Sequence, residues 1–223
     1  SILDSYPDAR VVGLTATPER ADGQPLGHVF HKMVVAAQYS QLLRDGHIVP
    51  CKVFHPPEII NGLALDAVDA YERYGEKASG FVFARDVDEA YDLALKFNQR
   101  GITAAVIEAN TAKEDRELYL DMFRSGMMRL IVNVYTMTEG IDVPAARVCL
   151  LARGCGHAST YLQMVGRVLR PHPGKEYGIV IDLAGAVLAH GLPTMDRKYS
   201  LEGRAISPSG VAALRVCLQC GLT

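Results

Sequence analysis

The chain has 223 residues, 49% of them apolar and 22% charged, with a formal net charge of −2. This is ordinary globular composition, which leaves room for one large domain or for a domain with appendages. The slightly negative net charge excludes a protein that is basic over its whole surface, so any binding of nucleic acid would need a local stripe of positive charge.

The printed residues predict neither a membrane span nor a secretory signal. No apolar run approaches the roughly 20 residues of a membrane span, and residues 1–8 lack the basic-then-apolar order of a secretory signal. Five cysteines without a framework fit a reducing compartment. We therefore expect a cytoplasmic protein with no membrane partner. Because the chain starts without Met and ends just after a Cys-x-x-Cys, we also expect a fragment of a longer protein.

The first elements in chain order are short. Residues 9–15 predict a buried strand, and 19–27 a loop or linker. Residues 29–35 predict a second strand, and residues 39–45 helical turns that stop at Gly46.

A regular alternation follows. Strands are predicted at 47–55, 80–84, 103–107, 129–134, 147–152 and 178–183, and helices at 64–74, 86–100, 112–125 and 159–169. Asp86 is the expected N-cap of the second of these helices, and Gly101 its stop. This spacing predicts an α/β fold over roughly residues 30–186, a doubly wound parallel sheet with helices on both faces.

Two motifs flank the predicted strand at 147–152. The first, residues 136–144, contains Gly140 and Asp142, and the second, residues 163–171, contains Arg167 and Arg170. Arginines three residues apart share one face of a helix, and two guanidinium groups fixed in this way suit a polyphosphate. For the arginine pair alone, a solvated helix face is the commoner explanation, but the neighbouring Gly-Ile-Asp favours a ligand site. We expect this first motif at the carboxyl edge of the sheet, where doubly wound folds bind ligands.

Residues 13–18, Gly-Leu-Thr-Ala-Thr-Pro, complete a known pattern. With them the chain resembles the second half of a superfamily 2 helicase or translocase. Motif III corresponds to this segment, motif IV to 80–83, motif V to 136–144 and motif VI to 163–170. The resemblance implies a RecA-like, P-loop NTPase-type lobe. It divides the chain into the tail of a first RecA-like domain with a linker (1–27), the second lobe (28–186) and a C-terminal extension (187–223).

Further stretches narrow the resemblance. Residues 13–23 and 42–50 look like the RadD/XPB-like branch, and residues 182–185, 190–193 and 196–201 look more specifically like RadD proteins. This branch implies a role in DNA repair. Type I and III restriction motor subunits and phage helicases share the core motifs and stay open as alternatives.

The resemblance assigns roles at an ATP cleft. Arg170 would be the arginine finger and Arg167 its neighbour at the γ-phosphate, with Gly140, Asp142 and Gln163 also binding ATP. Both arginines are expected to face solvent here, because the other wall of the cleft would belong to a partner domain. Thr15 and Thr17 would couple closure of the ATP site to strand movement, although their hydroxyls could instead satisfy loop amides.

Contacts to DNA and zinc are weaker expectations. Thr136 and Thr138 are candidates for contacts to the DNA backbone, which carry little sequence information. Arg85 and Arg116 could line the same surface, with a solvated face as the commoner alternative. Cys217 and Cys220 resemble half of a zinc knuckle, and since zinc needs four ligands, we expect Zn²⁺ only in an intact longer protein.

Two motifs are absent from the sequence. It has neither the phosphate loop Gly-x-x-x-x-Gly-Lys-Ser/Thr nor an acidic Asp-Glu box for Mg²⁺. We therefore expect ATP and Mg²⁺ to be used by the full-length protein, with a missing N-terminal RecA-like domain as partner, and the isolated chain to be inactive. A non-catalytic nucleic-acid-binding module remains a further alternative, although retaining Asp142, Arg167 and Arg170 would serve no purpose there.

Overall fold

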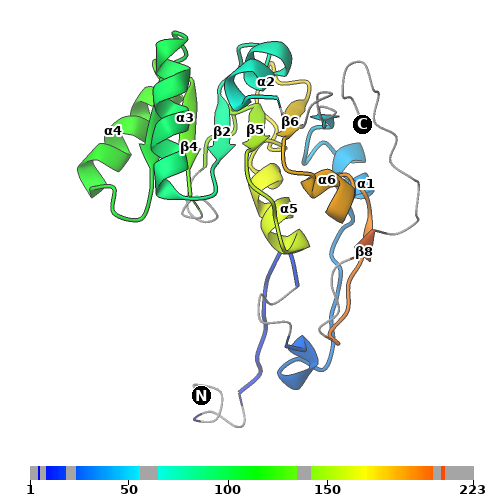
Figure 1. Cartoon of the computed structure of the whole chain (residues 1–223). Helices are drawn as coiled ribbons and strands as arrows, with labels where there is room; N and C mark the ends of the chain where they lie inside the picture. Colours follow the sequence, from blue (N-terminus) through cyan, green and yellow to red (C-terminus); the bar gives the residue numbers. More distant parts are fainter. Residues whose placement is uncertain are drawn as a thin grey trace.

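The computed structural model describes residues 5, 9–18, 24–55, 65–134, 142–202 and 207–208. Its centre is a six-stranded parallel sheet in the order β1-β6-β5-β2-β4-β3 (Figure 1). The strands are β1 (Cys51–Phe54), β2 (Gly80–Phe83), β3 (Ala104–Ile107), β4 (Leu130–Asn133), β5 (Val148–Leu151) and β6 (Gly178–Asp182). The predicted doubly wound, RecA-like α/β fold is confirmed.

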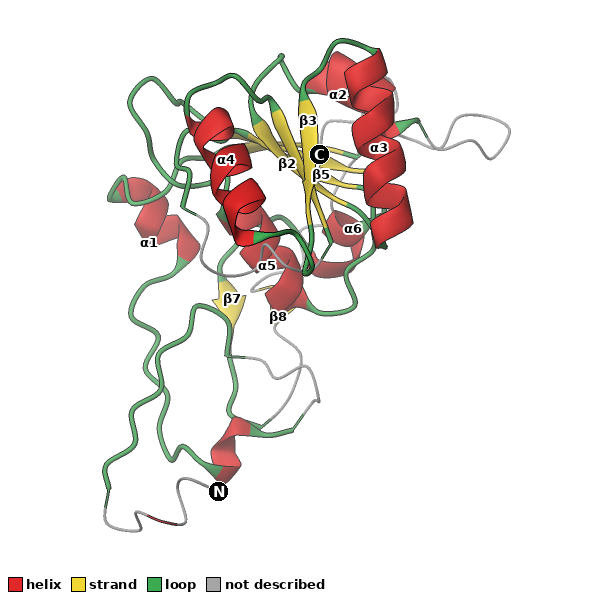
Figure 2. Cartoon of the chain, turned by 90° about the vertical axis from the view of Figure 1, so that its left-hand side faces the viewer, coloured by secondary structure: helices red, strands yellow, loops and turns green. Residues whose placement is uncertain are grey.

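Helices cover both faces of the sheet, as Figure 2 shows for α3 and α4. They are α1 (Tyr39–Arg44), α2 (Ala67–Tyr74), α3 (Val87–Gln99), α4 (Lys113–Arg124), α5 (Ala158–Gly166) and α6 (Ala186–His190). One apolar core joins α2 and α3 to the sheet, and a second joins α4, α5 and α6 to its other face. All residues of β2, β4, β5 and β6 are buried, which explains why these strands are continuously apolar instead of alternating.

Local signals act as the sequence predicts. The Asp86 carboxylate accepts a hydrogen bond from the Glu89 amide at 2.8 Å and so caps α3. Gly101 follows α3 with a φ of 72°, a left-handed conformation that costs glycine little. At Gly80 the demand is for space, since a Cβ atom there would lie 2.2 Å from the Val148 carbonyl oxygen.

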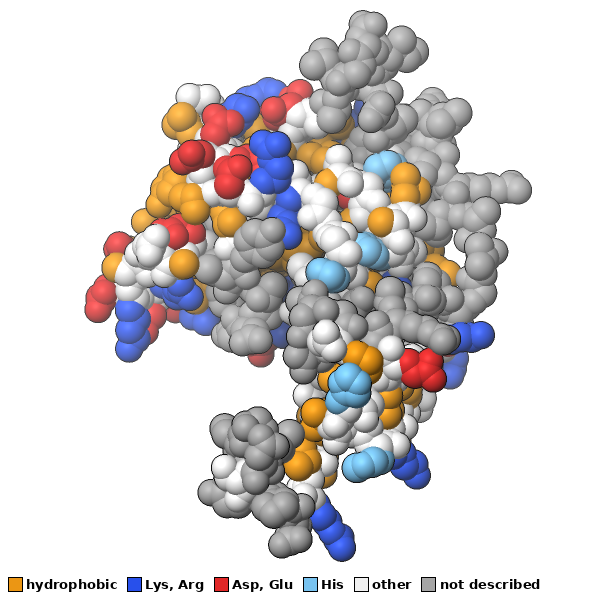
Figure 3. All heavy atoms as spheres, turned by 60° about the horizontal axis from the view of Figure 1, so that its bottom comes forward, with side chains coloured by type: hydrophobic (Ala, Val, Ile, Leu, Met, Phe, Trp, Pro, Cys, Tyr) orange, Lys and Arg blue, Asp and Glu red, His pale blue; other side chains and the backbone are white. Residues whose placement is uncertain are grey.

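The predicted strands at 29–35 and 9–15 are wrong. The described residues of 9–18 and 24–38 form an extended arm that projects below α1 and α5 in Figure 1, and neither segment pairs with a strand of the sheet. Hydrophobic side chains lie open on the arm in Figure 3, and Leu14 is 95% exposed. The two segments touch where Gly13 lies against the ring of Phe30. A β-branched pattern becomes a strand only where a neighbouring edge supplies hydrogen bonds, and within the described chain none is offered here.

A strap formed by residues 191–202 follows α6, and it was not predicted. The Asp182 carboxylate accepts a hydrogen bond from the Val187 amide at 2.7 Å, which caps the five-residue α6 from outside the helix. Arg197, in β7 (Arg197–Lys198), is 1% exposed, and β7 pairs antiparallel with β8 (Ser207–Pro208). In the part of the chain that the structure describes, every helix is too short or too polar to cross a bilayer.

Candidate functional site

Helix α5 and the turn that follows it carry the second motif. The helix ends at Gly166, earlier than predicted, so Arg167 and Arg170 lie in the turn and not on the helix. Hydrogen bonds from residue i+3 to residue i tighten this turn, with Val168 N to Val165 O at 3.0 Å. Three-residue spacing keeps both arginines on the side of Gln163, while Val165 and Val168 face the core.

A pocket opens along this outer side of α5. Its lining comes from three separate segments: Ala16 and Thr17 of the arm, Tyr39 at the start of α1, and Leu162, Gln163, Gly166, Arg167 and Arg170. The structure therefore brings residues of the two most distant motifs to one place. The pocket follows the outer side of α5 on one face of the sheet. The expected place of the first motif at the carboxyl edge of the sheet stays a prediction, because residues 135–141 lie outside the described residues.

The two threonines of the arm differ in their contacts. Thr17 is buried, and its hydroxyl accepts a hydrogen bond from Gln163 Nε2 at 3.3 Å, which links the arm to α5. The Thr15 hydroxyl stays within its own loop, where it accepts from the Thr17 amide and donates to the Thr17 carbonyl, both at 3.1 Å. Thr15 does not line the pocket.

The two arginines also differ. Arg167 lines the pocket but is only 5% exposed, so the expectation that it would face solvent is wrong. The side chain of Arg170 is 41% exposed and forms an ion pair with Asp142, which is 74% exposed. Gly140, Thr136 and Thr138 lie outside the described residues.

Lys175 is a buried residue of this region that sequence reasoning missed. Its ammonium donates to the carbonyl oxygens of Pro144 and Ala146 at 2.8 and 2.7 Å, which ties the turn after Arg170 to the segment after Asp142. Burial, with the charges of Arg147 and Arg170 beside it, lowers the pKa of Lys175 to about 8. A lone lysine in a Gly-rich turn gives no sequence signal for such a role.

The predicted DNA-contacting arginines lie away from the pocket. Arg85 is exposed after β2 and pairs with Glu89 at 3.1 Å. Arg116 is half-buried on α4, where it donates to the Glu108 carbonyl at 3.1 Å. Both therefore already have contacts within the fold.

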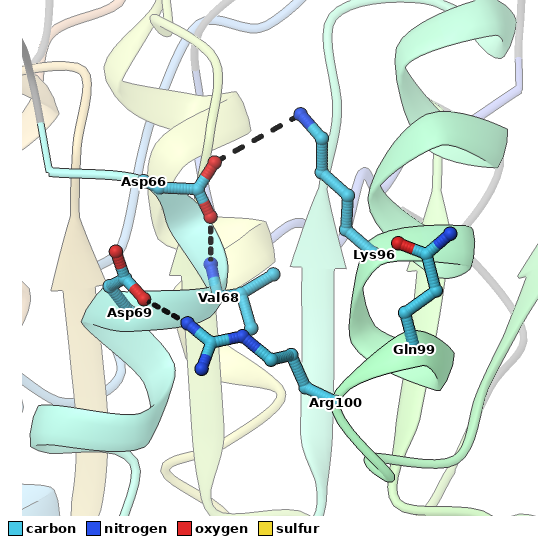
Figure 4. Close-up of a pocket in the computed structure, with 6 residues that line it drawn as sticks. All are labelled: Asp66, Val68, Asp69, Lys96, Gln99 and Arg100. Atoms are coloured by element: carbon cyan, nitrogen blue, oxygen red, sulfur yellow. Dashed lines mark hydrogen bonds and ion pairs between the residues drawn. The ribbon is translucent and has the colours of Figure 1, made fainter.

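A second pocket lies between α2 and α3, on the other face of the sheet (Figure 4). Its basic side chains are paired with acidic ones: Arg100 with Asp69 at 2.5 Å, and Lys96 with Asp66 at 4.0 Å. Because these charges balance one another, this pocket is not a candidate for a charged ligand.

The three cysteines that the structure describes offer no reactive thiolate. Burial raises the pKa of Cys51 to about 12 and is the main cause that raises that of Cys155 to about 11. Cys149 is fully buried, and its pKa is raised for the same reason. Among the described residues no group of three His, Cys, Asp or Glu could hold a metal ion. Cys217 and Cys220 lie outside those residues.

Residues 64–172 match the family described as the helicase conserved C-terminal domain. Together with the parallel sheet, this match shows that the chain contains a helicase conserved C-terminal domain.

Relatives agree with this assignment. The chain is 26% identical over 211 residues to the putative mitochondrial ATP-dependent helicase irc3 of Schizosaccharomyces pombe, covering 83% of this chain and 35% of the relative. It is 37% identical over 89 residues to the DNA 3'-5' translocase XPB2 of Sulfurisphaera tokodaii, covering 40% of this chain and 19% of the relative. The chain spans at most 50% of the length of these and other curated relatives.

Among solved structures, the fold is similar to a fragment of a putative HsdR subunit of a type I restriction enzyme from Vibrio vulnificus YJ016. The TM-score is 0.69 at 20% identity, over 92% of this chain and 44% of that one. At this identity the likeness concerns the fold.

Proposed function

We propose that the chain is the C-terminal lobe of an ATP-dependent DNA helicase or translocase, and that it supplies one wall of the ATP cleft. In this proposal Arg170 is the arginine finger and Arg167 binds the γ-phosphate, with Gln163 and Asp142 beside them. One observation carries the proposal: Thr17, Gln163, Arg167 and Arg170 line a single pocket although 146 residues separate Thr17 from Gln163.

The ion pair at the pocket rim supports a finger role for Arg170. As the γ-phosphoryl group transfers to water, charge spreads over its oxygens, and an arginine from outside the phosphate cradle stabilises it. Asp142 holds Arg170 near this position by an exposed ion pair, a kind of contact that contributes at most about 1 kcal/mol. A polyphosphate can therefore replace the carboxylate at little cost.

The buried arginine supports pre-organisation of the site. Arg167 is fixed in a tight turn whose next residues lie in the core. The Leu169 carbonyl accepts a hydrogen bond from the Val49 amide at 2.8 Å, which anchors the turn beside β1. A donor held in this way needs little reorganisation when charge develops, which is the condition for electrostatic catalysis.

The remaining catalytic parts would come from another domain. We propose that residues 1–27 belong with a first RecA-like domain, residues 28–186 form the second lobe, and residues 187–223 form an extension. The first domain would provide the phosphate loop and the Mg²⁺ ligands that this sequence lacks. Thr15 and Thr17 would then join movement of the two lobes to the pocket.

DNA is the nucleic acid along which the full-length protein is proposed to move. The match to a DNA 3'-5' translocase has a higher identity than the matches to RNA helicases, at 37% against 30% and 24%. Backbone contacts by Thr136, Thr138, Arg85 and Arg116 would bind it without sequence preference. A role in DNA repair is the finer form of this proposal.

The test is DNA-stimulated ATPase of the full-length protein. Arg170→Ala should lower turnover by about three orders of magnitude or more. Arg124→Ala is the matched control, because Arg124 is an exposed arginine of α4 paired with Asp121 at 2.8 Å, and it should leave turnover unchanged. Equal turnover in wild type and Arg170→Ala would reject the finger. The 223-residue chain alone should show no ATPase activity.

A further inference from the structure

The pocket beside α5 combines two kinds of lining. Arg167, Arg170 and Gln163 offer donors suited to phosphate oxygens. Tyr39 and Leu162 add an aromatic ring and an apolar side chain to the same pocket. Inorganic polyphosphate would use the first set alone, whereas a nucleotide has a flat heterocycle and a sugar that can use the second.

Tyr39 is held from both sides by the strap. On one side Gln38 makes two hydrogen bonds with the backbone of Arg197: its side-chain amide donates to the carbonyl at 3.0 Å, and its side-chain oxygen accepts from the amide at 3.1 Å. On the other side Ser40 donates to the Asp196 carboxylate from its amide at 2.8 Å and its hydroxyl at 2.7 Å. The first turn of α1 thus takes its place from the strap.

The strap is itself anchored in the core. The buried Arg197 guanidinium donates to the carbonyl oxygens of His190 and Leu192 at 2.8 and 2.9 Å. His190 bonds in turn to the Cys155 carbonyl at 2.6 Å, just before α5. The strap is therefore linked through His190 to the segment that leads into α5.

We propose that Tyr39 is the nucleoside-binding wall of this pocket, and that Asp196 and Arg197 are the residues that position it. This inference rests on the proposed function, because it takes the arginine side of the pocket as the phosphate site. The ring stacks on the base or packs on the ribose, and every base has a face that an aromatic side chain can cover. The pocket then distinguishes ATP from inorganic tripolyphosphate, although both ligands contain a chain of three phosphates.

The test compares these two ligands on the 223-residue chain, with affinities measured by NMR titration, which registers millimolar binding. Tyr39→Ala should weaken ATP binding about tenfold and leave tripolyphosphate binding unchanged, since stacking on a base is lost but the arginines stay. Tyr39→Phe should bind both ligands like wild type, and Tyr39→Leu, which keeps apolar bulk if the Ala variant fails to fold, should lose the ATP preference. Tyr91→Ala, which removes an exposed tyrosine of α3, is the control and should change neither affinity.

A further variant in the same experiment tests whether the strap positions Tyr39. Asp196→Ala should reproduce the selective loss of ATP binding in weaker form, whereas a general structural defect would weaken both ligands equally.

The outcomes separate this inference from the proposed function. If both ligands bind and Arg167→Ala weakens both, but Tyr39→Ala leaves ATP binding unchanged or weakens both equally, the tyrosine wall is wrong and the phosphate site stands. If wild type binds neither ligand, or if Arg167→Ala and Arg170→Ala change neither affinity, the proposed phosphate site is wrong. The proposed role of Tyr39, which depends on that site, is then wrong as well.

Discussion

Two clusters of basic side chains in this domain differ in where their carboxylate lies. Near the amino ends of β1, β5 and β6, Lys52 and Arg147 converge on Glu76 at 3.2 and 3.0 Å, and the Tyr177 hydroxyl donates to the same carboxylate at 2.9 Å. The acid is at the centre, and the bases surround it. Beside α5 the arrangement is reversed, because the arginines line the pocket and the acid, Asp142, is at its exposed rim.

The backbone under the first cluster shows what its charges accomplish. Glu76 and Lys77 have φ values of 51° and 55°, a left-handed conformation that costs non-glycine residues about 1 kcal/mol or more. The contacts to Glu76 and a hydrogen bond from Arg129 to the Lys77 carbonyl hold this turn. The first cluster is closed on its own acid and holds a strained turn, whereas the arginines beside α5 line a pocket, as the proposed phosphate site requires.

The sharpest test of this difference is a pair of arginine variants. Arg170→Ala should reduce ATPase of the full-length protein by about three orders of magnitude. Its free energy of unfolding should change by no more than about 1 kcal/mol, because the lost ion pair is exposed. Arg147→Ala should do the reverse, lowering stability and sparing turnover. Chemical denaturation and DNA-stimulated ATPase measure the two effects, and a matching pattern in both variants would remove the distinction.

Lys175 lies between the clusters, since Arg147 and Arg170 both act on its pKa. Lys175→Met should lower the free energy of unfolding by about 1–3 kcal/mol at pH 7, because two buried carbonyl groups lose their donor. The folded-state pKa of about 8 lies below the ordinary value of 10.5, so between these values the unfolded chain binds more protons. Wild-type stability should therefore rise across that window relative to Lys175→Met. Urea denaturation at pH 7, 8.5 and 10 checks this, and parallel curves would contradict the buried ammonium.

The contrast between these regions also marks what could be predicted from sequence. Residues near one another in the chain gave correct results: the cap at Asp86, the stop at Gly101 and the apolar strands are set by local chemistry. The strap and its hydrogen bonds with the start of α1 were missed, because Asp196 meets Ser40 across 156 positions and no periodicity in the sequence marks such a contact. The strands predicted in the arm were wrong for the opposite reason. The sequence pattern of the arm fits a strand, but strand formation depends on a pairing edge that the pattern cannot supply.

The candidate site divides in the same way. The motifs gave the residue types and the arginine spacing, and the structure does bring Thr17 and Gln163 together. The burial of Arg167 was missed, because the motif specifies a residue type but not how closely the folded chain packs around it. Tyr39 was missed because a tyrosine at a helix start is usually a core residue, and only the pocket gives it another surface.

The pH dependence of stability gives a further test of the cluster around Glu76. Burial of Glu76 opposes its ionisation, but hydrogen bonds from Tyr177 and Lys52 and the charges of Lys52 and Arg147 outweigh it, so its pKa is lowered. A depressed carboxyl pKa stabilises the fold above the unfolded-state value near 4.5, and this contribution is lost as pH falls through the folded-state pKa. Glu76→Gln should therefore cost about 1 kcal/mol at pH 7 and nothing once the wild-type acid is protonated.

The control for this pH test is Glu117→Gln. Glu117 forms an exposed ion pair with Lys113 on α4 at 3.9 Å. Its substitution should leave the free energy of unfolding within about 0.5 kcal/mol of wild type, both at pH 7 and at the low pH where Glu76 is protonated. A Glu76→Gln cost that persists at low pH would show that the shape of the side chain matters, and not its charge.

The smallest expected effect concerns the bond that closes the pocket. Gln163→Ala removes the 3.3 Å hydrogen bond to Thr17, a neutral contact that contributes roughly 0.5–1 kcal/mol. Global stability should hardly change, because the arm adds no strand to the sheet, but hydrogen exchange at Ala16 and Thr17 should become about two- to fivefold faster. Gln99→Ala, on the exposed surface of α3, should leave that exchange rate as it is. If Gln163→Ala leaves it unchanged too, residues 9–18 are held by the contact of Gly13 with Phe30, and their part of the pocket wall is independent of α5.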